Sequence, residues 1–354
     1  MTTFTIEEPE WSRLSGKTIL IVGGSRSGGI GRAAVEIARK HNANVALGDW
    51  NEEEGEDIST ELKDRFYFQK CDVTQWDDIL DLFEATVSKF GKIHAVLSNA
   101  GIAGEDFLSD EIDPQTGRLA APDLKTLDVN LYGMTYVTKA ALHYFSKWPE
   151  TQCQLVLTGS VASYIDGYSI PLYNASKMGV LGLVRGLRCM LFGKNVSLNM
   201  VAPVSRPYAM ILSVPFAHLF EGVGLTRASP VGNEYVISIL AMISKACGQE
   251  YSPMANISDV DTQMLRKGGI DKVWDGLPMN SAADAAKALL LPVLRPEIHG
   301  KSFWVGGGDI IEVEDKTHEA QPIWLTQKMS DDVDEGQHRI VPNFEQVVLS
   351  YRRK

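Results

Sequence analysis

The chain has 354 residues, 44% of them apolar and 22% charged, which fits one large globular domain with additions. A formal net charge of −11 argues against nucleic acid or an anionic membrane surface as the main partner. There is no run of about 18 apolar residues, so we expect no membrane span. The polar, acidic start is unlike a signal peptide, and the widely spaced cysteines predict reduced thiols without a disulfide or metal site. We therefore expect a cytoplasmic protein.

The first predicted unit is a strand, a glycine-rich turn and a helix. Residues 18–22 form an apolar run typical of a buried parallel strand, and residues 32–41 have helical periodicity. The turn between them reads Gly23-Gly-Ser-Arg-Ser-Gly-Gly-Ile-Gly31. Glycines let a backbone approach a pyrophosphate, whose charge the N-terminus of a helix attracts. The unit predicts a dinucleotide-phosphate site, although a structural turn explains the glycines alone equally well.

The next predicted strand, residues 44–48, ends at Asp49, roughly twenty residues after the glycine turn. A carboxylate at this point can accept hydrogen bonds from an adenosine ribose diol and would repel a 2′-phosphate. Asp49 therefore favours NAD, with NADP the less favoured cofactor. Arg26 in the turn points the other way, because an arginine could hold the additional phosphate.

Strands and helices keep alternating along the chain. This order predicts a doubly wound parallel sheet with helices on both faces, whose ligands bind beyond the carboxyl ends of the strands. Further strands are expected at 66–71, 95–98, 154–158, 196–201 and 301–305, and further helices at 75–90, 123–148, 175–192 and 280–294, with Asn280 or Ser281 as cap of the last.

Tyr173 and Lys177 are four residues apart at the start of a predicted helix, so they share one face. A free tyrosine titrates near pH ~10, and a neighbouring ammonium lowers that pKa by stabilising the phenolate. The phenolate can take a proton from an alcohol, and the phenol can give one to a ketone. We expect Ser160, at the end of the preceding strand, to hold the substrate oxygen. The spacing alone also fits an ordinary pair on a helix surface.

In their order and spacing, these motifs resemble the short-chain dehydrogenases/reductases, a family with a Rossmann-type fold. The resemblance covers residues 16–205, and residues 281–308 resemble the family's last helix and strand. Within the family the chain is most similar to NAD-dependent 15-hydroxyprostaglandin dehydrogenases, notably across residues 45–51 and 71–73.

The resemblance implies a role for each of four candidate catalytic residues. Tyr173 is the acid/base, and Ser160 steadies the substrate oxygen. Lys177 lowers the tyrosine pKa and binds the nicotinamide ribose. Asn130 holds a water that links Lys177 to solvent.

The resemblance also implies contacts to cofactor and substrate. Cofactor contacts are expected at the glycine turn and the strand ends: Gly23, Ser25, Ser27, Gly29, Ile30, Gly31, Asp49, Trp50, Cys71, Asp72, Val73, Asn99, Ala100, Gly101, Tyr173, Lys177, Pro203, Val204 and Ser205. Substrate contacts are expected at Ser160, Tyr164, Tyr168, Tyr208 and Ile211. Ser163, Tyr164 and Tyr168 are nearby alternatives for catalytic roles.

Three departures from the family pattern affect these expectations. The glycine turn is one residue longer than usual, so the sequence does not determine which of its amides contact the phosphate. The family's glycine and threonine after Pro203 are missing, and the Val204 backbone or Ser205 would then hold the nicotinamide. The segment 206–279 is longer than the family's usual substrate loop and is rich in large apolar residues. Such residues are typical of a packed core, or of a lid over an apolar pocket.

We therefore expect a tail at 1–15, a single Rossmann domain at 16–311 that includes a lid at 206–279, and a C-terminal extension at 312–354 with a solvated acidic turn at 331–335. The expected activity is NAD-dependent interconversion of a secondary alcohol and a ketone in a bulky apolar substrate. The alternatives are an isomerase or cyclase with a retained or recycled cofactor, and a non-catalytic nucleotide-binding protein. The helices at 123–148 and 173–192 are expected to build a homodimer or homotetramer.

Overall fold

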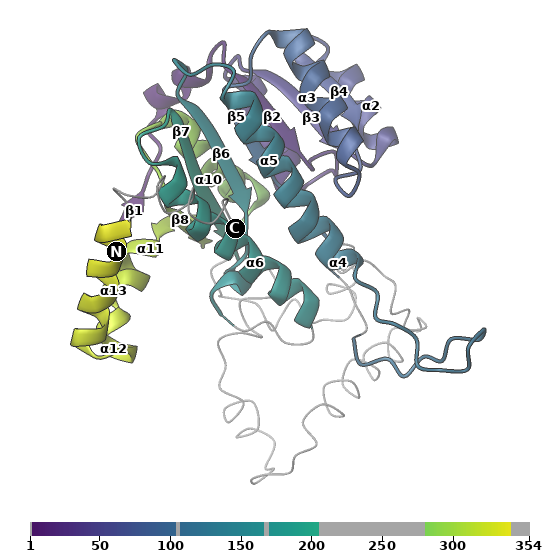
Figure 1. Ribbon diagram of the computed structural model, residues 1–354. Helices are drawn as coiled ribbons and strands as arrows, with labels where there is room; N and C mark the ends of the chain where they lie inside the picture. Colours follow the sequence, from purple (N-terminus) through teal and green to yellow (C-terminus); the bar gives the residue numbers. More distant parts are fainter. Residues whose placement is uncertain (1, 104–106, 166–169, 205–279, 341–354) are drawn as a thin grey trace, which may run out of the picture.

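The computed structural model describes residues 2–103, 107–165, 170–204 and 280–340 (Figure 1). Their centre is a nine-stranded sheet in the order β1-β9-β8-β7-β6-β5-β2-β3-β4. The strands β2 to β8 are parallel, and β9 and β1 are antiparallel additions at one edge. Their bounds are β1 Thr3–Phe4, β2 Thr18–Val22, β3 Asn44–Asp49, β4 Phe66–Lys70, β5 Ala95–Ser98, β6 Cys153–Thr158, β7 Val196–Pro203, β8 Ser302–Gly306 and β9 Asp309–Glu312.

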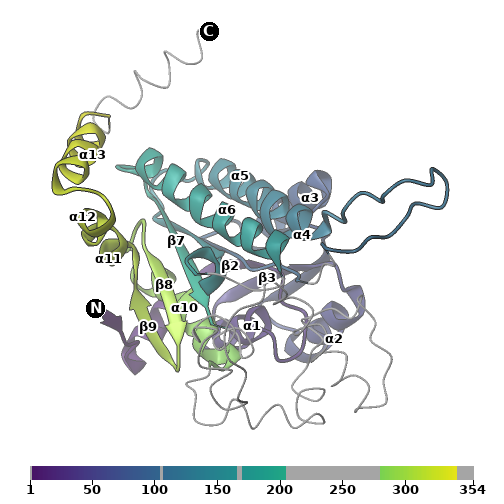
Figure 2. The same cartoon turned by 90° about the horizontal axis from the view of Figure 1, so that it is seen from below.

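Helices cover both faces of this sheet, as Figure 2 shows from below. On one face lie α1 (Ile30–Lys40), α2 (Glu52–Leu62) and α10 (Ala282–Leu294). On the other lie α3 (Trp76–Phe90), α5 (Met134–Phe145) and α6 (Pro171–Arg188). The predicted Rossmann-type fold is confirmed.

The apolar strands divide their side chains between these two layers. Ile19 and Ile21 of β2 enter the core under α1, whereas Leu20 and Val22 enter the core under α5. Successive residues of a strand point to opposite faces, so a strand buried on both sides must be apolar throughout. This is why residues 18–22 lack the alternation of a surface strand.

The helix predicted at 123–148 is interrupted next to the candidate site. It consists of α4 (Lys125–Leu127), a π-helical segment η2 (Asp128–Gly133) and α5. Gly133 lies against Val73, which follows β4 in the chain. The contact is so close that a Cβ atom at Gly133 would lie 2.7 Å from Val73 Cγ2. The π-helical turns contain Asn130, and such insertions frequently occur at functional sites.

Residues 2–15, which belong to the expected tail, are packed on the body. They carry β1 and the 3-10 helix η1 (Glu8–Leu14), and β1 pairs with β9. Trp11 and Leu14 are buried in the core. The Glu10 carboxylate accepts two hydrogen bonds of 2.9 Å from the Arg295 guanidinium, which lowers the pKa of Glu10 to about 2.

The C-terminal segment continues from β9 into three short helices, α11 (Glu314–Glu319), α12 (Gln321–Trp324) and α13 (Gln327–Ile340). The predicted acidic turn at 331–335 is wrong, because these residues lie within α13. The predicted lid at 206–279, with its helix-like stretches, lies outside the described residues. None of the helices in the described ranges combines the length and the apolar composition that a membrane crossing requires.

Candidate active site

Tyr173 and Ser160 meet beyond the carboxyl end of β6. Pro171 starts α6, a position that suits proline because the first helical N–H groups have no partner within the helix. Tyr173 therefore lies in the first turn of α6, and its hydroxyl is hydrogen-bonded to the Ser160 side chain. Ser160 Oγ also accepts a hydrogen bond from the Ala162 amide at 3.2 Å, in the short 3-10 helix η3 (Val161–Ser163).

Lys177 lies one turn further along α6, and its side chain is only 3% exposed. Its Nζ is 5.5 Å from the centroid of the Tyr173 ring and donates a hydrogen bond of 3.0 Å to the Thr158 carbonyl. Burial lowers the pKa of Lys177 to about 8, since an ammonium loses hydration there. The lysine therefore titrates close to neutral pH.

Burial also acts on the tyrosine. It raises the pKa of Tyr173, and the hydrogen bond from Ser160 offsets this only in part. The expectation that Lys177 lowers the tyrosine pKa stays a prediction. The phenol stays protonated at neutral pH, which is the form that can give a proton to a carbonyl oxygen.

Ser163 connects the turn after Ser160 to the helix of Lys177. Its Oγ donates to the Lys177 carbonyl at 2.8 Å and accepts from the Ser160 amide at 3.3 Å. Ser163 is buried, so its hydroxyl fixes the spacing of η3 and α6. The catalytic role weighed for Ser163 as an alternative stays a prediction.

Asn130 is fully buried, and its side chain binds both the amide and the carbonyl of Ile102. Its Oδ1 accepts from the Ile102 amide at 2.8 Å, and its Nδ2 donates to the Ile102 carbonyl at 2.8 Å and to Ser176 Oγ at 3.1 Å. These bonds connect η2, the segment after β5, and α6. The predicted role of Asn130, holding a water that links Lys177 to solvent, stays a prediction.

The glycine turn after β2 has the close packing of a dinucleotide cradle. Gly23 has a φ of +86°, and a Cβ atom there would lie 2.4 Å from Ala100 Cα. A Cβ atom at Gly31 would lie 2.1 Å from the Gly23 carbonyl oxygen. Helix α1 begins at Ile30 with Gly29 as its N-cap, so its first amides point out of the helix, as a phosphate site requires. The turn fits a dinucleotide, with Ser27 exposed nearby.

Asp49 lies at the end of β3, where its carboxylate faces this turn. Its Oδ2 accepts from the amides of Gly24 at 2.7 Å and Ser25 at 2.9 Å, and its Oδ1 accepts from the Asn51 amide at 3.1 Å. A carboxylate has about four acceptor sites, so room for one ribose hydroxyl remains. Ser25 is predicted to contact the cofactor, and in this structure its amide donates to Asp49.

The next strand ends also meet at this rim. Asn99 follows β5; its Nδ2 donates to the Gly23 carbonyl at 2.8 Å, and its Oδ1 accepts from Thr158 Oγ1 at 3.1 Å. A Cβ atom at Gly101 would lie 3.4 Å from Lys177 Nζ, so this glycine lies directly beside the lysine. Asn99 thus fixes the ends of β2, β5 and β6 relative to one another.

The residues that were predicted to contact the adenine side of the cofactor differ in how exposed their side chains are. Trp50 is 70% exposed, whereas Cys71 is buried and its thiol pKa is raised to about 12 by burial. The Asp72 carboxylate is engaged with the amide and hydroxyl of Thr74 at 2.9 and 2.8 Å. Val73 is buried against η2. The side chains of Cys71 and Val73 are therefore part of the packed interior, whereas Trp50 and Asp72 are exposed.

The backbone of Val204, predicted to hold the nicotinamide, is occupied. Its N–H donates to the Val305 carbonyl at 3.0 Å, and its carbonyl accepts from Asn280 Nδ2 at 3.0 Å. Asn280 was expected as a possible helix cap, but Ser281 caps α10 instead. Pro203 is the last residue of β7. Tyr168, Ser205, Tyr208 and Ile211 lie outside the described residues.

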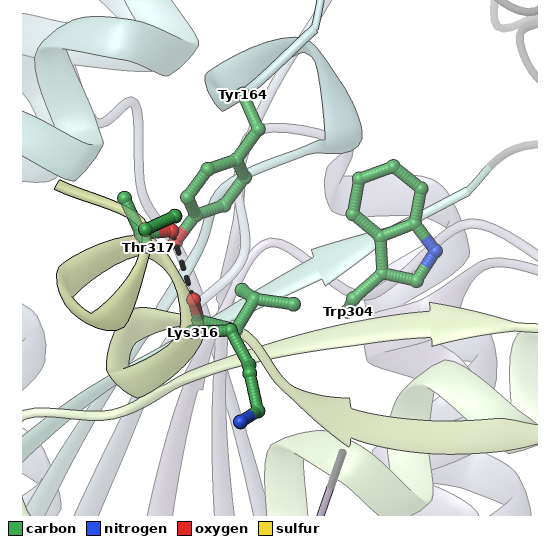
Figure 3. A pocket seen from close by; sticks show the side chains of 6 residues that line it. Tyr164, Trp304, Lys316 and Thr317 are labelled. Atoms are coloured by element: carbon green, nitrogen blue, oxygen red, sulfur yellow. Dashed lines mark hydrogen bonds between the residues drawn. The ribbon is translucent and has the colours of Figure 1, made fainter. Parts of the chain in front are cut away.

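Tyr164, predicted to contact substrate, points toward the C-terminal segment. Its hydroxyl donates to Glu314 Oε1 at 2.7 Å. The ring lines an open pocket of about 400 Å³ between η3, β8 and α11 (Figure 3). The other residues of this pocket are Trp304, Val313, Lys316, Thr317 and Ala320.

Sequence reasoning missed several residues that hold the site together. Thr158 binds both Lys177 and Asn99, and Ser176 binds Asn130. Thr158 ends a predicted strand just before Ser160, and that position was a usable signal. Glu314 lies beyond the part of the chain that resembles the family, so its partners were not predictable. No group of three His, Cys, Asp or Glu side chains in the described ranges is arranged to hold a metal ion.

Comparisons with known proteins agree with this geometry. The sequence profile of the family described as short chain dehydrogenase matches residues 17–206. Short-chain dehydrogenase/reductase prx4 from Penicillium roqueforti is 27% identical over 332 residues, which cover 94% of this chain and 87% of the relative. Short-chain dehydrogenase/reductase ATR7 from Stachybotrys chlorohalonatus is 32% identical over 252 residues, which cover 68% and 74%.

Two further matches come from a plant enzyme and a solved structure. (+)-Borneol dehydrogenase 2 from Salvia officinalis is 32% identical over 211 residues, which cover 59% of this chain and 70% of the relative. The crystal structure of a 3-ketoacyl-(acyl-carrier-protein) reductase from Brucella melitensis, complexed with NADH, covers 83% of this chain and 98% of its own. Its TM-score of 0.59 at 19% identity is a likeness of fold alone.

Proposed function

Because this chain belongs to the short-chain dehydrogenase family of oxidoreductases, we propose that it interconverts a secondary alcohol and a ketone with NAD as the cofactor. The observation that carries the proposal is the meeting of Ser160, Tyr173 and Lys177 beside the glycine turn. An acid/base, a hydrogen-bond donor for the substrate oxygen and a cation are the groups that this reaction requires from the protein.

Each side chain has a defined task in the proposed reaction. Tyr173 Oη gives a proton to the ketone oxygen, or takes one from the alcohol, while Ser160 Oγ holds that oxygen by a hydrogen bond. Lys177, whose pKa is about 8, resupplies the proton and places a positive charge beside the phenol. The nicotinamide, when bound, supplies or accepts the hydride.

NAD rather than NADP is supported by the charges around the ribose position. Asp49 lies at the end of β3, and the first turn of α2 carries Glu52, Glu53 and Glu54. Asp49 accepts from the amides of the glycine turn, and Glu54 Oε2 accepts from Ser25 Oγ at 3.5 Å, so both carboxylates lie at this turn, where negative charge disfavours a 2′-phosphate. The exposed Arg26 of the glycine turn is the opposing group.

A bulky, largely apolar substrate is supported by two observations. Residues 206–279 contain many large apolar side chains directly after the strand that faces the nicotinamide position. One relative is named for borneol, an apolar secondary alcohol. The resemblance to 15-hydroxyprostaglandin dehydrogenases, which also points to a large lipid-like alcohol, stays a prediction.

A homodimer or homotetramer is part of the proposal. Its support is the exposure of large side chains on η2, α5 and α6, where Tyr132 is 54%, Tyr136 37% and Met178 46% exposed. Apolar surface of this kind is typical of protein interfaces. Light scattering at micromolar concentration tests this, and a monomer mass would contradict it.

The function is tested by incubating the protein with NAD and a panel of terpenoid, steroid and polyketide alcohols, and with NADH and the corresponding ketones. We expect formation or consumption of NADH with at least one pair, and much slower turnover with NADP(H). Conversion of substrate without net change in NADH would instead favour an isomerase or cyclase. Failure to bind either nicotinamide cofactor would favour a non-catalytic protein.

A further inference from the structure

A buried carboxylate of the C-terminal segment contacts two elements of the candidate active site. Glu314, the first residue of α11, has a side chain that is 3% exposed. Its Oε1 accepts from the Tyr164 hydroxyl at 2.7 Å. The Arg185 guanidinium donates to both carboxylate oxygens at 3.0 Å, and Arg188 Nη1 donates to Oε2 at 3.1 Å. A buried carboxylate with this many charge-assisted bonds fixes geometry strongly.

The partners of Glu314 lie on the elements that carry the reacting groups. Arg185 and Arg188 are on α6, which carries Tyr173 and Lys177 in its first two turns. Tyr164 directly follows η3, the turn that starts at Ser160. Glu314 therefore connects the helix that carries the proposed acid/base to the turn that carries the proposed substrate-oxygen donor.

Two sets of hydrogen bonds hold the turn of Ser160 to α6. Ser163 links the Ser160 amide to the Lys177 carbonyl. Glu314 links Tyr164 to Arg185. A turn held to a helix at two points cannot rotate about either one, so the spacing of Ser160 and Tyr173 is fixed.

Glu314 is itself held against the sheet. Its amide donates to Glu312 Oε1 at 2.7 Å, and Glu312 is a buried residue at the end of β9. The Val313 amide donates to the Ser302 carbonyl of β8 at 3.0 Å. The start of α11 thus takes its position from the antiparallel edge of the sheet, and Glu314 transmits that position to η3 and α6.

We propose that Glu314 is a positioning residue for the reaction: it sets the distance between Ser160 and Tyr173, and makes the C-terminal segment part of the active-site scaffold. The effect of Glu314 on the reaction rests on the proposed function, whereas its effect on the distance between Ser160 and Tyr173 does not. The residue touches neither substrate nor cofactor in this scheme and acts through Tyr164 and Arg185.

The test compares three variants with the wild-type protein. Glu314→Gln keeps the shape and removes the charge, and Tyr164→Phe removes only the bond to η3. Glu10→Gln is the matched control, because Glu10 also binds an arginine through both oxygens but lies at η1, remote from the proposed chemistry. Hydrogen–deuterium exchange is measured at 160–165, at 171–188 and at β3, together with kcat, KM and the Kd for NAD.

We expect Glu314→Gln to speed exchange at 160–165 and 171–188 but not at β3, and Tyr164→Phe to speed it at 160–165. Glu314→Gln should lower kcat between about tenfold and a hundredfold, with little change in KM or the Kd for NAD, because misplaced groups slow the chemical step. Exchange and kcat equal to those of Glu10→Gln would overturn the proposal, as would a lower melting temperature with unchanged kcat. If the wild type turned over no substrate, the proposed function would fail, and the exchange data alone would decide the positioning role.

Discussion

At the scale of single residues, the site depends on how burial acts on two groups of opposite charge. Burial keeps Tyr173 protonated and brings the pKa of Lys177 down to about 8. Both effects have the same cause, since each charged form loses water that the protein replaces only in part. The hydroxyl of Ser160 and the carbonyl of Thr158 are the replacements in the structure. A protonated tyrosine beside a lysine with a pKa of about 8 suits the proposed reaction in the direction of ketone reduction.

The lysine predicts a pH dependence of stability. Its pKa falls from 10.5 to about 8 on folding, so burying the ammonium costs about 3 kcal/mol at neutral pH. Between pH 8 and 10.5 the unfolded chain binds more protons than the folded one, so this contribution makes stability rise with pH.

Urea unfolding over the lower part of that window measures the effect. Lys177→Met should remove the rise, whereas the exposed control Lys139→Met should keep it. Equal slopes of the unfolding free energy against pH in the two variants would contradict the assignment of this titration to Lys177.

At the scale of elements, the π-helical segment η2 holds neighbouring parts of the candidate site together. Asn130 lies in this segment and clamps the chain after β5 to α6 through Ile102 and Ser176. These hydrogen bonds require an asparagine whose side chain points toward Ile102 and Ser176. A regular helix would point the side chain at this position in another direction. The interruption of the helix is thus tied to the contacts that Asn130 makes.

Asn130→Ala should therefore affect both stability and turnover. It leaves buried groups of Ile102 and Ser176 without partners, which predicts a loss of about 3 kcal/mol in the free energy of unfolding. Asn199 is a matched control, because it is also buried and also holds two backbone groups, at Ile298 and Lys301. Asn199→Ala should lose similar stability but keep its kcat per folded molecule, and Asn130→Ala should lose both. An unchanged kcat in Asn130→Ala would remove η2 from the active-site scaffold.

The sequence predicts those elements whose cause is local. The strand at 18–22 and the glycine turn after it follow from apolar runs and glycines, and the structure has them at those positions. The π-helical break at Asn130 depends on contacts to Ile102 and Val73, which are remote in sequence. Local periodicity therefore predicted one unbroken helix.

At the scale of the whole molecule, both ends of the described chain close the same edge of the sheet. β1 pairs with β9, and β9 pairs with β8, so strands near the start and near the end of the described chain form one antiparallel border (Figure 2). Glu314 follows this border and binds Arg185 of α6. A two-residue strand and a buried carboxylate partner give no periodic pattern, so the packed N-terminus and the Glu314 contacts were not predicted.

The carboxyl ends of β2, β3, β5, β6 and β7 bring residues from most of the chain to one rim. Asn99 ties three of those ends together, and Asp49 ties the glycine turn to the end of β3. These positions were predictable because a parallel sheet gathers the ends of its strands. Their hydrogen bonds were not, since a side chain named as a ligand contact can equally hold its neighbours, as Asp49 and Asn130 do.

The central claim is that Tyr173 handles the proton while a dinucleotide lies on this rim. The most direct measurement is single-turnover hydride transfer in Tyr173→Phe, with a substrate pair that the wild type converts, alongside calorimetric binding of NAD. We predict that NAD binding is retained and that the rate falls between about a hundredfold and ten-thousandfold, as for loss of a general acid/base. An undiminished rate, or loss of NAD binding in this variant, would contradict the account.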